Sequence, residues 1–467
     1  MADYQIEPGS FRDRSNRVFY VDGAILRGLD EKGLAEWEAL SSRKFFQRFT
    51  DEGKLIQTER IYNVEGIDTS LKGKWAAVLN HKPVPFISYP YEWSFGMLKD
   101  AALLQLELLL AALDEEMILK DSSAFNFQWI GTRPVFIDIP SFERLYPGDP
   151  WVGYRQFCQM FLYPLFLQAH KDIPFQPWLR GSIDGIAPEH CNNLMSFFDL
   201  LRRGVFMHVY MQCKMQARYA RTQRDVKGDL RATGFNKGLI RANVRSLEKV
   251  LYRLRWKRAK SEWSQYENNT SYTEMDRGIK EAFVRNVVGS RHWGLVWDFG
   301  CNTGAFSRIA AEDASYVVAM DADHLAVDRL YLELRAEGNI SILPLIINLA
   351  DPSPNLGWKG LERKSLSERG RPDLMLCLAL IHHLVITANI PLREVIDWFA
   401  GLGASLVIEF VTKEDPMVKE LLRNKEDNYT DYESEYFERC LCEAFDLSEC
   451  KMLTCGTRIL YFARAKN

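Results

Sequence analysis

A short run of glycines and polar residues near position 300 has the composition of a ligand-binding loop. Asp298 ends an apolar stretch, and Gly300, Asn302 and Gly304 follow at alternate positions before an apolar-periodic segment begins. Glycine, and also asparagine, tolerates the left-handed backbone of a tight turn. A strand that passes through such a turn into a helix brings the backbone close to a ligand and directs free N–H groups toward it. An ordinary strand-to-helix turn is the alternative explanation.

Two further polar residues follow later apolar runs. Asp321 ends the run 316–320, about twenty residues after Gly300, where a carboxylate can accept hydrogen bonds from both hydroxyls of a ribose. Asn348 ends the run 342–347. The position of Asp321 therefore predicts a contact with the ribose of a ligand.

Groups suited to proton transfer follow the next two apolar runs. His382 and His383 come after the run 373–381, and Glu409 comes after the run 405–408. An imidazole with an ordinary pKa of about 6.5 can act as a general base at neutral pH. Adjacent residues point in different directions, so we expect only one histidine to face a substrate. Capping of the next helix is the alternative role for each.

These polar residues follow five apolar runs that are separated by helical patterns. Such an alternation predicts a doubly wound α/β sheet, in which the carboxyl ends of the parallel strands meet at one edge. The runs are 294–297, 316–320, 342–347, 373–381 and 405–408. The loop pattern Asp-x-Gly-x-Asn-x-Gly departs from Gly-x-Gly-x-x-Gly, which argues against a nicotinamide dinucleotide.

In these residues, the segment 294–467 resembles the class I S-adenosylmethionine (SAM)-dependent methyltransferases. The matching segments are Asp298–Gly304, Asp321, Asn348–Asp351 and Leu380–Leu384. More loosely, the whole chain resembles the nodulation-associated group of bacterial methyltransferases. The resemblance implies that Asp298, Gly300, Asn302 and Gly304 surround the methionine part of SAM. It also implies that Asp321 binds the ribose and that Asn348, where the family often has an acid, lies near the adenine.

The resemblance favours a small-molecule methyl acceptor. The chain has no Asn/Asp-Pro-Pro-Tyr segment and no Pro-Cys nucleophile, which disfavours methylation of nucleic-acid bases. An RNA or protein acceptor, met through the first half of the chain, is an alternative. A non-catalytic SAM-binding or RNA-associated module is another.

The first half of the chain carries a second pattern. Asp121, Asn126 and Asp138 have the spacing of the kinase-like fold's catalytic centre, in which one Asp accepts a hydroxyl proton while Asn and the second Asp hold magnesium. Arg27 stands where a phosphate-binding lysine is expected, and no Gly-x-Gly-x-x-Gly is present. Turn capping and a kinase-like scaffold without phosphoryl transfer are therefore preferred to an active kinase, and Mg-ATP is the less favoured ligand.

Between the two patterns the chain is basic. Residues 211–260 contain fifteen Lys or Arg against three acids, and a helical stripe at Ile240, Val244, Leu247, Leu251 and Leu254 predicts one buried face. A solvated connecting helix is preferred to an RNA-binding surface in the range 214–260. The following polar aromatic segment predicts a lid, with Tyr272 as a cofactor contact beside Trp263 and Tyr266. Lys280 follows on a predicted helix, 276–288.

Composition bounds the remaining possibilities. The 467 residues are 47% hydrophobic and 26% charged, with net charge −3, which is typical of globular domains. We expect an α+β domain at 1–213, a basic connector and lid at 214–290, and the methyltransferase domain at 291–467. Without an apolar leader or an apolar run long enough to span a bilayer, we expect a cytoplasmic protein with no membrane segment. Nine cysteines in irregular spacing predict reduced thiols and no metal site. The oligomeric state is not indicated.

Overall fold

The computed structural model describes residues 4–62, 75–219, 236–257, 273–423, 425–426 and 428–466. The chain divides into two compact units. Unit 1 comprises Met1–Trp129, Arg133–Lys257 and Leu356–Arg363, and unit 2 comprises Ile130–Thr132, Arg258–Asn355 and Lys364–Asn467. The range 214–290, predicted as one connector, is therefore shared between the two units, because its helices α10 (Lys237–Arg253) and α11 (Glu274–Val288) pack into different cores.

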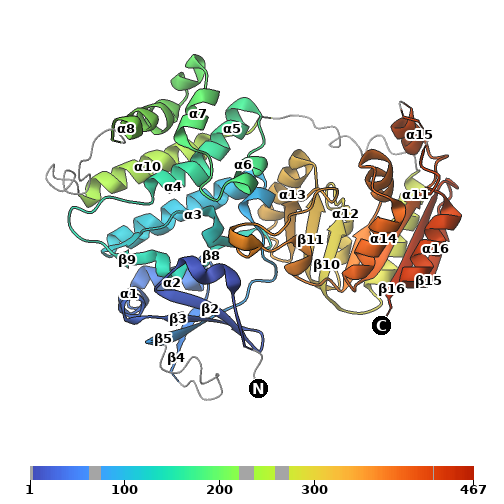
Figure 1. The fold of residues 1–467 in the computed structure, drawn as a ribbon, viewed down its shortest axis with the longest axis horizontal. Helices are drawn as coiled ribbons and strands as arrows, with labels where there is room; N and C mark the ends of the chain where they lie inside the picture. Colours follow the sequence, from blue (N-terminus) through green and yellow to red (C-terminus); the bar gives the residue numbers. More distant parts are fainter. Residues whose placement is uncertain are drawn as a thin grey trace. The chain divides into compact units, whose positions relative to one another are not determined.

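Unit 2 is built on a seven-stranded sheet in the order β12-β11-β10-β13-β14-β16-β15 (Figure 1). Its strands are β10 (Trp293–Phe299), β11 (Ala314–Asp321), β12 (Ile342–Ile346), β13 (Leu374–Cys377), β14 (Ser405–Val411), β15 (Phe445–Met452) and β16 (Arg458–Ala465). The first five in spatial order pair in parallel, whereas β16 pairs antiparallel with both neighbours. The prediction of a mixed α/β sheet with mostly parallel strands is confirmed.

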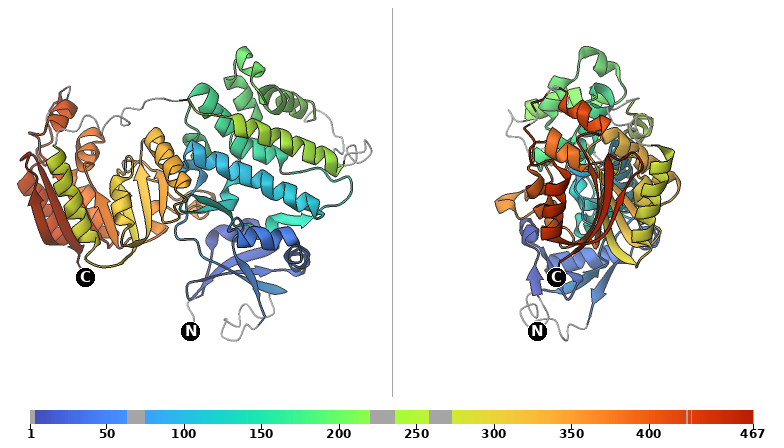
Figure 2. Two further views of the ribbon diagram at one scale, coloured as in Figure 1. Left: turned by 180° about the vertical axis from the view of Figure 1, so that it is seen from behind. Right: turned by 90° about the vertical axis from the view of Figure 1, so that its right-hand side faces the viewer.

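Helices cover both faces of this sheet. Figures 1 and 2 show α11, α12 and α13 on one face and α14 and α16 on the other. The helices are α11 (Glu274–Val288), α12 (Ala305–Ala310), α13 (His324–Ala336), α14 (Leu392–Gly401), α15 (Pro416–Leu422) and α16 (Ser434–Ala444). Short turns of 3-10 helix, η9 (Trp358–Gly360) and η10 (Leu366–Glu368), and the π-helical turn η11 (His383–Thr387) lie in the connections. Because helices shield both faces, the five parallel strands are mostly apolar, and Val296, Val317 and Leu374 are fully buried in one core.

The strand order creates a switch point between β10 and β13. From β10 the chain moves outward through β11 to β12 and then returns to β13 on the other side of β10. In open α/β sheets ligands bind in the crevice at the carboxyl ends of the strands where the order reverses. The loops after β10 and β13 are therefore the first places to look for a site.

Unit 1 begins with a five-stranded antiparallel sheet in the order β1-β2-β3-β5-β4. The strands are β1 (Tyr4–Ile6), β2 (Asn16–Val21), β3 (Ala24–Leu29), β4 (Thr58–Ile61) and β5 (Ala77–His81). Strands β2 and β3 are joined by a hairpin turn at Asp22-Gly23, where both residues have positive φ, 47° and 81°, as the tightest hairpin turns require. Other elements before the long helix are η1 (Pro8–Arg12), α1 (Glu31–Ser41), α2 (Lys44–Asp51) and η2 (Pro90–Glu92).

The rest of unit 1 surrounds the long apolar helix α3 (Phe95–Asp114). Strand β6 (Met117–Leu119) pairs with β9 (Phe142–Arg144), and β7 (Phe127–Ile130) with β8 (Arg133–Phe136). Short turns η3 (Ala124–Asn126) and η4 (Ile139–Ser141) connect them. The helical region that follows contains α4 (Tyr154–Phe157), η5 (Cys158–Leu162), α5 (Tyr163–Lys171), α6 (Gln176–Gly181), α7 (Pro188–Leu194), η6 (Phe197–Leu201), η7 (Phe206–Met211) and α8 (Gln212–Tyr219).

The basic helix α10 (Lys237–Arg253) packs against α3. Its predicted apolar face is confirmed, since Ile240, Val244, Leu247, Leu251 and the following Leu254 are all buried. Two of its cations form ion pairs within unit 1, Lys237 with Glu116 and Arg241 with Asp114. Part of the positive charge is thus balanced by neighbouring acids. Within the described parts of the chain, no helix has the length and apolar character to cross a membrane.

Candidate active site

The loop after β10 has the left-handed backbone that its residue types predict. Gly300, Asn302 and Gly304 have φ of 72°, 46° and 80°. Gly300 lies directly against the β13 loop, because a Cβ built on it would be 3.5 Å from Leu380 Cδ1. The two loops of the switch point are therefore in contact.

Asp321 lies beside this loop, as its position in the sequence predicts. One carboxylate oxygen, Oδ2, accepts the Asn302 N–H at 2.9 Å, and Oδ1 accepts the Asp323 N–H at 2.8 Å. Gly300 N–H also donates to the Met320 carbonyl at 2.8 Å. Burial raises the pKa of Asp321 above its ordinary value. The carboxylate thus fixes the loop, and since a carboxylate has about four acceptor sites it can still accept from a ribose hydroxyl.

Two polar atoms of the loop face the interior. The carboxylate of Asp298 is fully buried and accepts the Ser307 hydroxyl at 2.5 Å, and burial raises its pKa to about 6. Asn302 Oδ1 is buried and has no hydrogen-bond partner among the described residues. A buried acceptor without a donor is destabilising. A ligand that supplies an N–H or O–H at this point would remove that penalty.

The remaining residues predicted to contact the cofactor do not join the Gly300–Gly304 loop and Asp321. Asn348 is exposed, and its Oδ1 accepts the N–H of Ala350 at 3.0 Å, so its side chain closes its own turn. This leaves only its amide nitrogen for an adenine. Trp263, Tyr266 and Tyr272, predicted as a lid, lie outside the described residues.

The two histidines do not directly follow a strand. Strand β13 ends at Cys377, and Ala379 leaves the sheet with φ of 52°, so His382 lies in a helical turn and His383 opens η11. Their ring centroids are 4.2 Å apart. Neither ring nitrogen of His382, which is fully buried, has a partner in the described chain.

Burial also changes the ionisation of both imidazoles. It lowers the pKa of His382 well below the ordinary value, and the positive charge of His383 would act in the same direction. Burial, followed by the charge of Arg458, lowers the pKa of His383 to about 4. The expectation of an ordinary histidine pKa is therefore wrong, because these rings are enclosed. Both are neutral at physiological pH.

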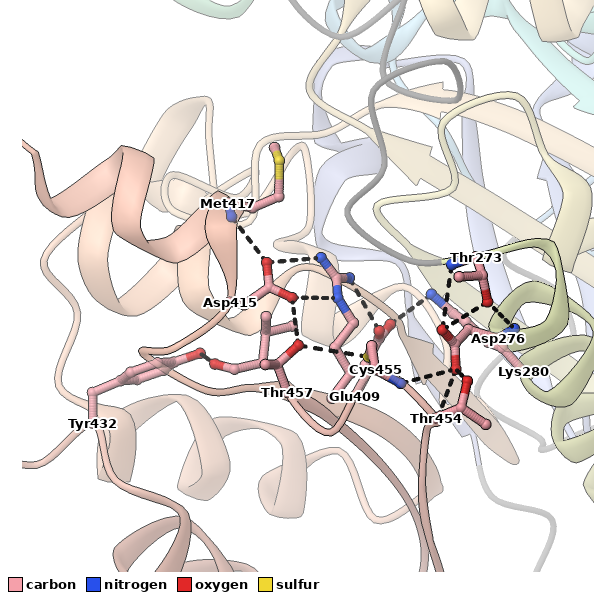
Figure 3. A network of polar contacts seen from close by, with 12 residues as sticks. Thr273, Asp276, Lys280, Glu409, Asp415, Met417, Tyr432, Thr454, Cys455 and Thr457 are labelled. Atoms are coloured by element: carbon pink, nitrogen blue, oxygen red, sulfur yellow. Dashed lines mark hydrogen bonds and ion pairs between the residues drawn. The ribbon is translucent and has the colours of Figure 1, made fainter.

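Glu409 belongs to a buried network of charges (Figure 3). It lies inside β14 rather than after it. Its Oε2 accepts Lys280 Nζ of α11 at 2.5 Å, and its Oε1 accepts Arg458 Nη1 of β16 at 3.2 Å. Arg458 Nε continues the network to Asp415 Oδ2 at 2.8 Å. All four side chains are almost fully buried.

The network fixes the ionisation of Glu409. Burial alone would raise the pKa of this carboxyl, but the charges of Lys280 and Arg458 oppose burial and the net pKa lies below its ordinary value. A carboxylate held by two cations is a poor proton acceptor. The geometry therefore favours a positioning role for Glu409 over the base role suggested by its sequence position.

A second set of contacts ties α11 to the β15–β16 turn (Figure 3). Asp276 Oδ2 accepts from Thr273 at the start of α11, and its Oδ1 accepts the N–H and hydroxyl of Thr454, each at 2.6 Å. Sequence reasoning missed Arg458, Asp415 and Asp276. Their partners are distant in sequence, so no local spacing identifies them.

The third predicted cluster lies in unit 1. Asp138 Oδ1 accepts Arg27 Nη1 at 3.0 Å, and its Oδ2 accepts the Ser141 hydroxyl at 2.5 Å. Burial raises the pKa of Asp121, and so does the charge of Asp138, while a hydrogen bond from Asn126 lowers it. The three predicted residues and Arg27 therefore converge.

The glycine positions of the β10 loop give a matched test of stability. Gly304→Ala should lower the free energy of unfolding by about 2–4 kcal/mol, from left-handed strain plus overpacking, since the new Cβ would lie 2.6 Å from Leu330 Cδ1. Gly300→Ala should cost only the strain, about 1–2 kcal/mol, because its nearest neighbour is at 3.5 Å. Denaturant titration measures both, and equal losses would contradict this account.

Comparison with known proteins gives a relative along nearly the whole chain. The nodulation protein NoeA of Rhizobium meliloti (strain 1021) is 35% identical over 456 residues, which cover 97% of this chain and 94% of that protein. No protein-family model matches the sequence.

Solved structures show weaker similarity. The N-methyltransferase NodS from Bradyrhizobium japonicum is 15% identical, covering 41% of this chain and 97% of NodS, with a TM-score of 0.30. Magnesium protoporphyrin IX methyltransferase from Synechocystis, with bound S-adenosylhomocysteine, is 18% identical, covering 44% and 92%, with a TM-score of 0.31. The bifunctional kinase-methyltransferase WbdD is 15% identical, covering 43% and 41%, also at 0.31. TM-scores of this size do not establish a common fold.

Proposed function

The chain belongs to the family of the nodulation protein NoeA, and we propose that this family member is a class I SAM-dependent methyltransferase acting on a small-molecule acceptor. The observation that carries the proposal is the position of the Asp321 carboxylate beside the left-handed Gly300–Gly304 loop at the switch point of the sheet. The unpartnered Asn302 Oδ1 within the same loop supports a ligand there.

Each part of the site has a defined task in this proposal. Asp321 binds the ribose hydroxyls, the Asp298–Gly304 loop encloses the methionine part, and Asn348 Nδ2 lies beside the adenine. Bound SAM supplies an electrophilic methyl carbon on a sulfonium. The protein must then align an acceptor with that carbon, and alignment alone is worth up to about 7–11 kcal/mol.

The histidines are the residues best placed to orient the acceptor. His382 is buried, neutral and without a hydrogen-bond partner in the described chain, so an acceptor hydroxyl or amine that donates to its ring would satisfy a buried nitrogen. His383, whose ring lies 4.2 Å away, provides the second imidazole. The Lys280–Glu409–Arg458 network holds α11, β14 and β16 around them.

The pH dependence of the reaction tests this assignment. Because the pKa of His383 is about 4, its neutral form is complete above about pH 5 and disappears as the pH falls through 4. The single-turnover rate with methyl-labelled SAM should therefore show no histidine-dependent change between pH 5.5 and 8. A rate that halves near pH 6.5, where an ordinary histidine titrates, would contradict it.

Incubation with methyl-labelled SAM and fractionated cell extract identifies the acceptor. Loss of labelling in Asp321→Ala separates enzymatic transfer from background. With the acceptor known, one of the two substitutions His382→Ala and His383→Ala should reduce the rate by about 10²-fold, because the acceptor is no longer held in line. Full activity in both variants would remove the histidines from the mechanism.

A second candidate function concerns unit 1. We propose that the convergence of Arg27, Asp121, Asn126 and Asp138 makes a kinase-like nucleotide site. In the described chain no three His, Cys, Asp or Glu side chains gather as metal ligands, so a magnesium ion would need Asn126 and phosphate oxygens as well. Arg27, now paired with Asp138, would turn to the phosphates.

Nucleotide binding decides this second candidate. Wild-type protein should bind Mg-ATP in an equilibrium titration, and Asp138→Ala should lose at least about tenfold in affinity, because it removes a metal ligand. Asp149→Ala, in the same unit but outside the cluster, is the control. Absence of ATP affinity in the wild type would eliminate the function.

A further inference from the structure

Unit 1 exposes a group of apolar side chains between residues 196 and 215, here called the apolar tip. Phe197, Phe198 and Leu201 of η6 are 75%, 78% and 77% exposed. Phe206, Met207 and Met215 of the following helices are 45%, 61% and 47% exposed. Phe157 and Phe161, earlier in the same helical region, are by contrast fully buried. Several large apolar side chains exposed on neighbouring elements indicate an interaction surface.

The exposed side chains stand on a fixed backbone. Ser196 and Asp199 form a reciprocal capping box at the start of η6, and Ser196 Oγ donates to Asp199 Oδ2 at 2.6 Å. Asp199 is buried and also forms ion pairs with Lys171 and Arg202. Elements η6 and η7 are in contact. The backbone that carries the apolar tip is therefore held in place by hydrogen bonds and ion pairs.

The charge around the tip is positive. Arg202, Arg203 and Lys214 are exposed, whereas Asp199 is the only acid within 196–215, a range that the structure describes throughout, and it is buried. One exposed acid of α7, Glu189, lies close enough to this segment that, after the larger effect of burial, its negative charge raises the pKa of Cys213. Apolar side chains therefore project from a surface whose exposed charges within the segment are all cationic.

We propose that the apolar tip docks unit 1 on the surface of an anionic lipid bilayer. Phe197, Phe198 and Leu201 enter the boundary between headgroups and acyl chains, and Arg203 and Lys214 contact anionic headgroups. Side chains that stay about three-quarters exposed protrude, so a flat protein partner would bury little of them, whereas a deformable bilayer surrounds them. The docking is peripheral and independent of the methyltransferase proposal.

Vesicle co-sedimentation of the full chain tests the proposal. The protein should bind vesicles of equimolar phosphatidylcholine and phosphatidylglycerol and bind phosphatidylcholine vesicles much more weakly. Phe197→Ser/Phe198→Ser should reduce binding at least about tenfold. Arg203→Ser and Lys214→Ser should each reduce it about fivefold at low salt, and added salt should weaken the wild type.

The matched control is Leu239→Ser/Tyr252→Ser, which removes apolar side chains 53% and 60% exposed on α10. It should bind as the wild type does. Failure of the wild type to bind anionic vesicles, or equal binding by the tip variant, overturns the proposal. The alternative partner is a second copy of this chain, and light scattering without lipid measures the oligomeric state. A wild-type dimer that becomes a monomer in the tip variant would assign the tip to self-association instead.

Discussion

Asp321→Ala should abolish measurable binding of S-adenosylhomocysteine, with a loss of at least about 100-fold in affinity. Hydrogen bonds to a charged group contribute about 1.5–3 kcal/mol each, and the ribose would donate two. The substitution also removes the acceptor that holds the Asn302 N–H at 2.9 Å, so the loop loses its anchor. Isothermal titration measures the change.

Two variants control the interpretation of this loss. Asp321→Asn keeps the side-chain volume and removes the charge, so it should retain more affinity than Asp321→Ala. Asp313→Ala removes an exposed acid just before β11, at the opposite end of that strand from Asp321, and should bind normally. If Asp321→Ala bound the ligand as tightly as the wild type, the ribose would be held elsewhere.

Glu409→Gln should be the most destabilising single change in the buried charge network, lowering the free energy of unfolding by about 3–5 kcal/mol. The substitution leaves Lys280 and Arg458 buried with one counter-ion, Asp415, between them. Denaturant titration followed by tryptophan fluorescence measures the loss. The second change Lys280→Met should restore part of it, since it removes one uncompensated charge. Arg393→Ala, which breaks exposed ion pairs, should leave unfolding nearly unchanged.

The same variant has a defined pH dependence. The folded-state pKa of Glu409 lies below its ordinary value of 4.5, so its ionised form contributes stability above pH 4.5 that is lost as the pH falls through the folded pKa. The stability difference between wild type and Glu409→Gln should therefore be full at pH 7 and shrink below pH 4.5. A difference that grew on acidification would contradict the ionised assignment.

Local patterns predicted the parts of the site that local geometry controls. The left-handed turn at Gly300, Asn302 and Gly304 follows from residue types, and the approach of Asp321 follows from the length of one helix and one strand. The first five sheet strands were visible as apolar runs. The antiparallel pair β15 and β16 was not resolved, because its exposed strand β15 carries little apolar signal.

The surroundings of several site residues depend on packing between segments that are distant in the sequence, so they could not be predicted from local patterns. The run 373–381 reads as one apolar strand, but the chain leaves the sheet after Cys377 and forms a helical turn that buries His382 and partly buries His383. Glu409 appeared as a free carboxylate because its partners lie on α11 and β16. The exposure of Phe197 and Phe198 could not be predicted from the sequence, because helical spacing does not reveal which face of a helix remains uncovered.

Calorimetric titration of the wild-type chain with S-adenosylhomocysteine tests the central claim most directly, because it needs no knowledge of the methyl acceptor. We expect saturable binding at one site per chain, in the switch-point crevice between the Gly300–Gly304 loop and the β13 loop. The absence of binding heat with both S-adenosylhomocysteine and SAM, across temperatures that exclude an enthalpy near zero, would contradict the account.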